Sequence, residues 1–84
     1  EGLTVLHLGI GVSIVANKVK GVRCALCTNS DMATMTRRHN NANVLAMGQR
    51  YVDFDTAKQI VNAFLSTPFD GGRHQRRVEK IETL

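Results

Sequence analysis

Three short apolar runs, each followed by a segment with helical spacing, constrain the fold of this sequence more than any other feature. The runs are residues 3–8, 22–27 and 44–47. Apolar runs of this length, bounded by turn residues, predict buried strands. Strands that alternate with helices indicate a parallel sheet with helices packed on its faces. We therefore expect an α/β fold with about three strands, as a single domain over residues 1–84.

Start and stop signals place the first two helices between these runs. The spacing predicts a helix over residues 11–18, with Gly21 as its C-terminal cap. Asn29, with an acidic residue two positions later, predicts the start of a second helix that runs to about residue 39. Met32 and Met35, with the alanine and threonine beside them, are expected to face the core.

The rest of the chain predicts a third helix and a charged terminal one. Asp53 or Asp55 caps the third helix, which stops at residues 66–68. Its apolar stripe consists of Ala57, Ile60, Val61, Phe64 and Leu65. Gly71 and Gly72 then turn the chain into a final helix with only a thin apolar edge.

Charge and composition limit the classes of partner. The chain carries 11 Lys and Arg against 7 Asp and Glu, a net charge of +4, and 5% aromatic residues. The surplus lies in two clusters, residues 37–39 and 73–80. Clustered positive charge points to an anionic partner, which composition leaves open as a phosphate, a nucleic acid or a membrane surface.

Two cysteines, Cys24 and Cys27, form a C-x-x-C spacing inside an apolar stretch. Neither a second pair nor a nearby histidine completes a zinc set, and in a strand two thiols this far apart point to opposite faces. We expect reduced core thiols rather than a redox pair. With no signal peptide and no membrane-spanning run in the sequence, a cytoplasmic protein is expected.

The basic C-terminal segment resembles an anion-binding device. Arg73 and Arg77 lie at positions i and i+4 of the predicted helix, with His74 beside them. Positive charge at a helix start is unfavourable by about 0.3–1 kcal/mol for each residue, which an anion would reverse. Free amides at the helix start would add to a phosphate site. The alternative is a solvated basic face.

His39 and Asn40 end the second predicted helix. The purely structural interpretation is a basic last turn followed by Asn40 as a left-handed C-cap. The functional interpretation places this helix end beside the carboxyl ends of the strands, where ligands bind in open α/β sheets. There His39 could relay a proton near neutral pH.

Gly9 and Gly11 form a turn between the first strand and the first helix, with Ser13 following. Such a turn can hold a phosphate or a sugar, and Ser13 could donate to the ligand, although a lone G-x-G also serves turns and packing. His7 is the nearest group before this turn that can transfer a proton, and nothing in the sequence orients it.

Taken together, these motifs resemble the C-terminal half of the ribose-5-phosphate isomerase B and galactose-6-phosphate isomerase family. The blocks, in order, are residues 9–14 (GIGVSI), 16–19 (ANKV), 21–26 (GVRCAL), 38–40 (RHN), 43–48 (NVLAMG) and 71–77 (GGRHQRR). The last block and the HN-x-x-NVLA-x-G block are similar to the ribose branch. The resemblance covers nearly all of the chain from Gly9 onward.

The resemblance implies a Rossmann-like α/β/α sandwich, of which this chain holds about three strands and a C-terminal helix. It implies isomerisation of ribose 5-phosphate and ribulose 5-phosphate in pentose phosphate metabolism, through an enediolate, without metal or cofactor. The active site would be shared between the subunits of a homodimer. The implied roles are ring opening by His39, enediolate and hydroxyl binding by Asn40, Gly9 and Gly11, and phosphate binding by Arg50, Arg73 and Arg77 near His74.

Two departures from the family bear on activity. The family's turn usually reads Cys-Gly-Thr-Gly with the cysteine as base, whereas Leu6, His7 and Leu8 occupy its first three positions here. The family's N-terminal strands and substrate contacts are also absent from this sequence. We therefore expect binding to exceed turnover, with a non-catalytic sugar-phosphate-binding or dimerisation fragment as the alternative. A nucleic-acid binder, for which no aromatic stacking platform is present, and a membrane partner are not expected.

Overall fold

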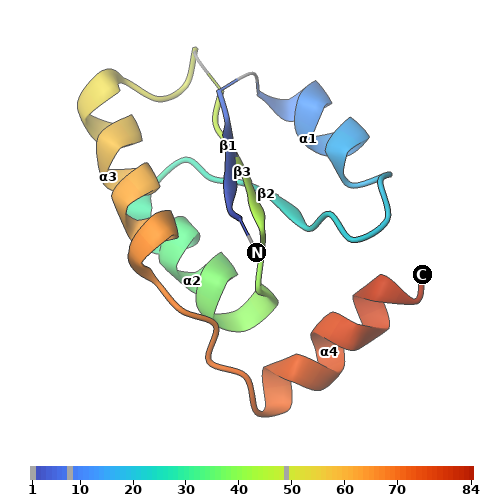
Figure 1. Ribbon diagram of the computed structural model, residues 1–84. Coiled ribbons are helices and arrows are strands. Elements are labelled where there is room, and N and C mark those ends of the chain that lie inside the picture. Colours follow the sequence, from blue (N-terminus) through green and yellow to red (C-terminus); the bar gives the residue numbers. More distant parts are fainter. Residues whose placement is uncertain (1, 8, 49) are drawn as a thin grey trace.

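The computed structural model, which describes residues 2–7, 9–48 and 50–84, has the predicted alternation of strands and helices (Figure 1). The elements are β1 (Thr4–Leu6), α1 (Ile10–Ala16), β2 (Cys24–Leu26), α2 (Ser30–Asn40), β3 (Val44–Ala46), α3 (Phe54–Ser66) and α4 (Arg73–Glu82). Within the described residues, no helix combines the length and the apolar character needed to cross a membrane. The prediction of an α/β fold with three strands is confirmed.

The sheet is parallel, and its strand order is β1-β3-β2. Val5 and Ala25 both pair with Leu45, so β3 lies between the two strands that precede it in the sequence. Leu45 is fully buried, whereas the residues of β1 and β2 are half-buried or exposed. The prediction of a buried strand in residues 22–27 is therefore wrong for residues 24–26, because among the described strands β2 pairs on one side only, with β3.

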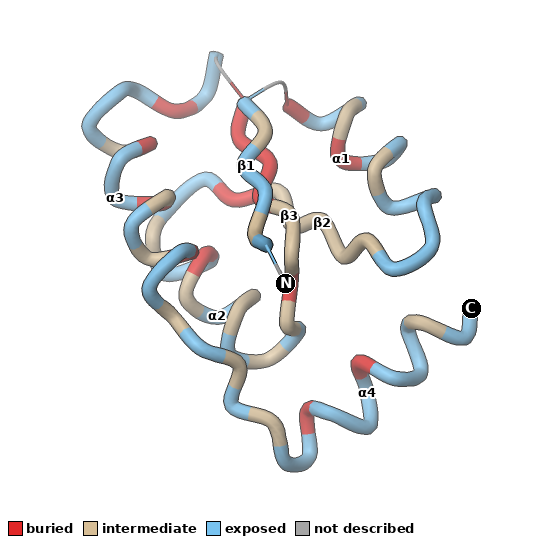
Figure 2. The backbone as a smooth tube through the Cα atoms, in the orientation of Figure 1, coloured by how far each residue is buried: buried red, intermediate tan, exposed pale blue. Residues whose placement is uncertain are grey.

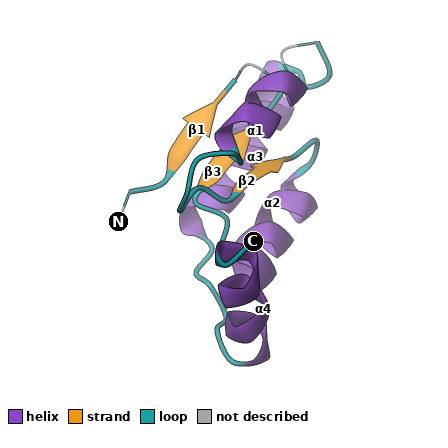
Figure 3. Ribbon diagram, turned by 90° about the vertical axis from the view of Figure 1, so that its right-hand side faces the viewer, coloured by secondary structure: helices purple, strands orange, loops and turns teal. Residues whose placement is uncertain are grey.

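Helices cover both faces of this sheet, and a further helix lies near the amino ends of its strands. In Figure 1, α2 and α3 pack on one side of the strands and α1 on the other, as an α/β/α sandwich requires. Seen from the side in Figure 3, α4 lies beyond the sheet, next to the C-terminal end of α2. Figure 2 shows the buried segments concentrated on β3 and on the inner sides of α2 and α3. The core cluster consists of Cys27, Ala33, Ala42, Leu45, Met47, Val52, Ala57, Ile60 and Phe64.

Local hydrogen bonds explain where the two longest helices begin. The side chain of Asn29 accepts a bond of 2.8 Å from the Met32 amide, and that of Asp53 accepts one of 2.8 Å from the Thr56 amide. Both predicted N-caps are confirmed, with Asp53 rather than Asp55 in the second case. That hydrogen bond also lowers the pKa of Asp53.

Burial differs from the prediction on the outer sides of α2 and α3. Met32 and Met35 are 41% and 43% exposed, while Ala33 is fully buried. The small side chain of Ala33 lets α2 approach the core that α3 supplies, which turns the methionines outward. Leu65, expected in the apolar stripe of α3, is 53% exposed, because it lies on the outer side of that helix.

Helix α1 ends earlier than its sequence predicted. Its C-cap is Asn17, whose side-chain amide donates to the carbonyls of Ser13 and Cys24, and Gly21 lies in the turn that follows. The Asn17 side chain also accepts from the Cys24 amide, so it bridges the end of α1 to the start of β2. This bridge replaces the glycine cap and fixes the crossover connection.

Candidate functional site at two opposite edges of the sheet

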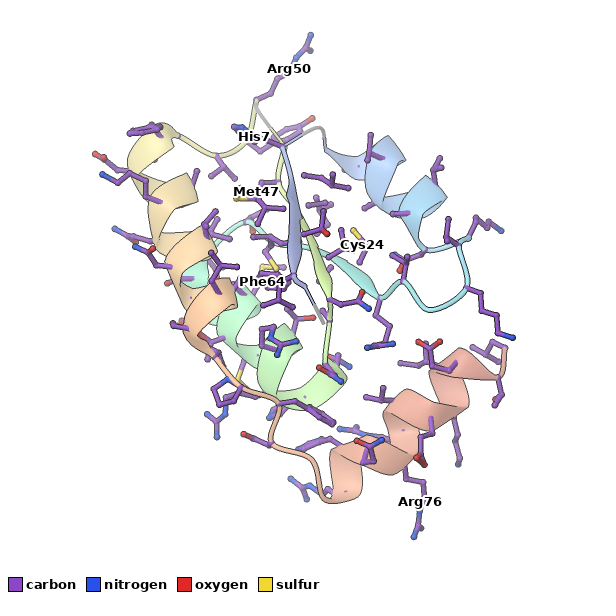
Figure 4. The ribbon with its side chains drawn as sticks, in the orientation of Figure 1. His7, Cys24, Met47, Arg50, Phe64 and Arg76 are labelled. Atoms are coloured by element: carbon purple, nitrogen blue, oxygen red, sulfur yellow. The ribbon has the colours of Figure 1, made fainter. Side chains whose placement is uncertain are left out.

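The predicted site residues divide between the two ends of the parallel strands. We call these the carboxyl edge and the amino edge of the sheet, after the strand ends that lie there. Gly9 and Arg50 follow the carboxyl ends of β1 and β3. His39 and Asn40 end α2, which runs back from the carboxyl end of β2 to the opposite, amino edge. In Figure 4 the labelled His7 and Arg50 lie at one end of the molecule and Arg76 at the other. The expectation that His39 lies beside the strand carboxyl ends is therefore wrong.

At the amino edge the structure brings together His39, His74 and Arg77. The imidazole rings of His39 and His74 stack with their centroids 4.3 Å apart and their planes 18° from parallel. A guanidinium nitrogen of Arg77 lies within hydrogen-bond distance of Nδ1 of His74. Because a guanidinium can only donate, His74 accepts at Nδ1 and is neutral in this arrangement, with its proton on Nε2.

The surroundings of His74 favour its neutral form. Burial, followed by the nearby His39, Arg77 and Arg73, lowers the pKa of His74, and Asp70 opposes this shift. The imidazole of His74 is mostly covered, at 8% exposure. This histidine is therefore suited to hold a fixed hydrogen bond near neutral pH rather than a charge.

Helix α4 starts at this cluster and carries its charges to the surface. Gly71 and Gly72 have φ angles of 72° and 57°, the left-handed region that the turn into the helix requires. Arg73 and Arg77 are exposed on the same face, and Figure 4 shows Arg76 directed away from the fold. The first turn of α4 holds no acidic residue, so its arginines lie together at the positive end of the helix dipole.

The amides of this helix start are less available than the sequence suggested. The amide of His74 donates to the Gly71 carbonyl and that of Gln75 to the Gly72 carbonyl, both at 3.1 Å. These two bonds close the glycine turn on itself. Anion binding at this end would therefore rest on the arginine side chains more than on free backbone amides.

Asn40 has a different place from the one its sequence indicated. It is the last, exposed residue of α2, and the left-handed C-cap is Asn41, with φ 49°. Asn40 lines a small cavity that also includes Thr36 and Cys24, between α2, β2 and α4. The backbone assigns the cap to Asn41 because the helix continues one residue further than the Asn-Asn break predicted.

Three groups at the amino edge have the chemistry of metal ligands. The nearest ligand atoms of His39, Asp70 and His74 all lie within 4.8 Å of one another. Their arrangement is poor for a cation, however, since parallel rings do not direct their lone pairs to one point. Arg77 already contacts Nδ1 of His74, and the Arg38 guanidinium pairs with Asp70 at 3.1 Å. The surplus of guanidinium groups suits an anion better than a metal ion.

At the carboxyl edge, Gly9 is the residue of the glycine turn whose backbone conformation favours glycine. It is buried, caps α1 with φ 94° and ψ −157°, and lies close to Gly48, which follows β3. Gly11 and Arg50 are exposed. The hydroxyl of Ser13 is buried and donates to the Ile10 carbonyl at 2.6 Å, so its hydrogen is used within α1.

Leu6, at the position where the resemblance implies the base, is half-buried and is the last residue of β1. An aliphatic side chain has no lone pair with which to accept a proton. His7, the next residue, is exposed and lines a shallow pocket with Phe54 and Lys58 of α3. The third replaced position, Leu8, lies outside the described residues.

The two cysteines are thiols, as expected. Cys27 is 1% exposed in the core, and Cys24 is half-buried in β2. Burial, and to a lesser extent the neighbouring Cys24, raises the pKa of Cys27 to about 11, and burial raises that of Cys24. Both thiols are therefore poor nucleophiles at neutral pH.

The first basic cluster makes contacts within the fold that the sequence did not predict. Arg37 donates to three oxygens of the protein, and Arg38 pairs with Asp70. These two charges are therefore engaged within the fold rather than presented together to an anionic partner. No spacing rule could have identified the partners Thr67 and Asp70, because they lie about 30 residues further along the chain.

Known proteins resemble this chain over almost its whole length. The model of the Ribose/Galactose Isomerase family matches residues 1–81. The chain is 45% identical over 83 residues to ribose-5-phosphate isomerase B of Escherichia coli, covering 99% of this chain and 56% of that protein. The solved ribose-5-phosphate isomerase B of Clostridium thermocellum superposes with a TM-score of 0.90 at 52% identity, covering 99% of this chain and 56% of that one.

A third relative was solved with a sugar phosphate. The ribose-5-phosphate isomerase B of Mycoplasma genitalium, with bound ribulose 5-phosphate, has a TM-score of 0.89 and 45% identity, covering 98% of this chain and 54% of that one. The chain thus spans about half the length of the relatives it matches, and it corresponds to their C-terminal part. The chain belongs to the ribose/galactose isomerase family.

Proposed function

We propose that this chain binds a sugar phosphate of the ribose 5-phosphate class and forms part of an aldose–ketose isomerase. The observation that carries the proposal is the cluster at the amino edge, where His39 stacks on His74 and Arg77 contacts His74. A group able to transfer a proton thus lies beside guanidinium groups that can bind a phosphate. The relatives named above support this class of reaction.

The separation of the site residues supports a homodimer with a shared active site. One chain places the glycine turn and Arg50 at the carboxyl edge, and His39 and the α4 arginines at the amino edge. A two-fold axis would bring the carboxyl edge of one chain to the amino edge of the other, forming two equivalent sites. Each site would then take its glycine turn from one subunit and its histidine from the other.

In such a site the roles follow from the groups present. His39, half-exposed at the end of α2, would transfer the proton that opens the furanose ring. Arg50, Arg73 and Arg77 would bind the phosphate, with His74 held by Arg77. Asn40 and the backbone at Gly9 and Gly11 would bind the enediolate and the sugar hydroxyls. Isomerisation then removes the proton from C2 of the aldose, passes through the enediolate, and returns a proton to C1.

Leu6 supports the alternative of a chain that binds but turns over slowly. Proton abstraction from C2 needs a base, and Leu6 supplies none at the position where the family's cysteine lies. A non-catalytic sugar-phosphate-binding or dimerisation chain is therefore the second candidate. The two candidates share the phosphate site and differ only in the chemical step.

The phosphate site is tested by thermal unfolding in the presence of ribose 5-phosphate. We expect the ligand to raise the Tm of the parent chain, and the rise to vanish in Arg73→Ala/Arg77→Ala. The matched control is Arg76→Ala/Lys80→Ala, which removes the same charge from the same helix and should retain the rise. An equal rise in both double variants would contradict the assignment of Arg73 and Arg77.

The chemical step is tested separately by conversion of ribose 5-phosphate to ribulose 5-phosphate. A rate above that of buffer would support the isomerase, and ligand stabilisation without conversion would support the binding chain. The variant Leu6→Cys/His7→Gly/Leu8→Thr restores the family's turn. A higher rate in this variant than in the parent would show that the replaced turn limits the rate.

A further inference from the structure

Arg37 is tied to three separate parts of the structure at the end of α2. Its Nε donates to the Thr67 carbonyl at 3.0 Å, and one terminal nitrogen donates to the Asn41 side chain at 3.0 Å and to the Ala42 carbonyl at 2.7 Å. Its guanidinium also lies over the ring of Phe64, 5.8 Å from the centroid. Phe64 is fully buried, so Arg37 connects the core to the surface loop.

These contacts determine where the connection between α3 and α4 lies. Thr67 is the first residue of that connection, and Asn41 and Ala42 form the turn that follows α2. The connection is joined to α2 a second time, because the Asp70 amide donates to the Arg38 carbonyl at 3.1 Å. Residues 67–70 therefore follow the end of α2, and α4 begins three residues later.

We propose that Arg37 is a positioning residue, which sets α4 so that His74 stacks on His39 and the arginines of α4 lie beside the imidazole pair. Its relevance to catalysis rests on the proposed function above. Arg37 itself faces the core and the loop, and it acts on the site only through residues 67–72.

The shape of the arginine side chain, rather than its charge, should carry this role. A guanidinium donates in several fixed directions at once, whereas an ammonium group is a point charge on a flexible stem. We therefore expect Arg37→Lys to lose the positioning role just as Arg37→Met does.

The test compares Arg37→Lys and Arg37→Met with Arg38→Met in the full 84-residue chain. Arg38 lies one residue away, and its side chain makes a partly exposed ion pair with Asp70 of the same connection, so the control removes the same charge and one contact to residue 70 while the three hydrogen bonds of Arg37 stay. The first readout is the pKa of His74, followed by NMR of its ring protons. The second is the affinity for inorganic phosphate, measured by titration well below the Tm of each variant.

Both Arg37 variants should shift the pKa of His74 upward, toward the ordinary 6.5, because the ring would leave the cover of α2 and the charge of His39, whereas Arg73, Arg77 and Asp70 move with the same segment. Since a displacement of about 1 Å can cost up to about 100-fold in a site, we expect phosphate affinity to fall roughly tenfold. Arg38→Met should change it by less than about threefold, as a screened surface charge does.

A merely structural role of Arg37 would lower the Tm and leave the pKa of His74 unchanged, and that result would overturn the proposal. Full rescue by Arg37→Lys would also overturn it. If Arg37→Met does not fold, Arg37→Lys decides the question, because it keeps the charge and loses the forked set of donors. An unchanged His74 pKa in that variant contradicts the proposal.

The two readouts separate this inference from the proposed function. If the parent chain binds no phosphate, the phosphate site is wrong, and the pKa of His74 still reports on the position of α4. If the parent binds phosphate and both Arg37 variants bind it equally well, the phosphate site stands and the positioning role is wrong.

Discussion

Alanine at the two glycines of the strand–helix turn should change stability in opposite directions. Gly9 has φ 94° and ψ −157°, a region of backbone conformation that is essentially restricted to glycine. A side chain there costs about 1–3 kcal/mol in backbone strain. The added Cβ of Gly9→Ala would lie 3.7 Å from the Gly48 Cα, an ordinary contact, so the cost comes from the backbone and not from a collision.

Gly11 is the matched control, two residues further and inside α1. A Cβ on Gly11 would have no neighbouring atom within 4 Å, and its φ is not positive. Alanine is favoured over glycine in a helix by about 0.8–1 kcal/mol, so Gly11→Ala should stabilise the chain.

Thermal unfolding of the two variants, followed by circular dichroism, measures this difference. In a domain of this size about 1 kcal/mol shifts the Tm by roughly 4–8 °C. Gly9→Ala should lower the Tm by at least that amount, and Gly11→Ala should leave it unchanged or raise it. An unchanged or higher Tm for Gly9→Ala would refute the conformational assignment at the turn.

Three further predictions concern the core, the imidazole pair and a helix cap. Phe64→Ala should lower the free energy of unfolding by about 3–5 kcal/mol in urea titrations, because Phe64 is fully buried. In the control Leu65→Ala, where the side chain is 53% exposed, the free energy of unfolding should fall by less than about 1 kcal/mol. Because the pKa of His74 is lowered in the folded chain from its ordinary 6.5, the folded state takes up a proton less readily than the unfolded one. The contribution of His74 to stability is thus complete above pH 6.5 and decreases as the pH falls through the folded pKa. His74→Gln should therefore weaken the dependence of the urea midpoint on pH, measured between about pH 7.5 and 5. Asn29→Ala should lower the free energy of unfolding by about 1 kcal/mol through loss of the cap bond to the Met32 amide, and an unchanged urea midpoint would show that the cap is dispensable.

The parts of the fold that depend on neighbouring residues were predictable from the sequence. Asn29 and Asp53 cap their helices through hydrogen bonds to amides three residues away, and such bonds need no tertiary context. Burial was less predictable, because it depends on which strand becomes central. Cys24 and Leu45 both lie in apolar runs, yet only Leu45 lies in the strand between two neighbours.

The candidate site shows the same division. The family motifs identified Gly9, His39 and Arg77 as candidates, since those motifs are local in sequence. The edge at which His39 lies was also deducible, because a helix that follows a parallel strand returns to the amino edge of the sheet. The contact of Arg37 with Thr67 was not, since it joins two segments 30 residues apart that only the packing of α2 on α3 brings together.

The strand order β1-β3-β2 also has a consequence for how the chain is synthesised. Among the described residues, β1 and β2 each pair with β3 alone. The ribosome therefore releases both edge strands before the residues from Val44 onward that join them exist. Until then residues 4–6 and 24–26 lack the strand with which they pair in this structure, and non-local pairing of this kind forms slowly. A pause in translation shortly before residue 44 would prolong the time for which both strands lack β3, and a strand edge without its partner is prone to pair with another chain.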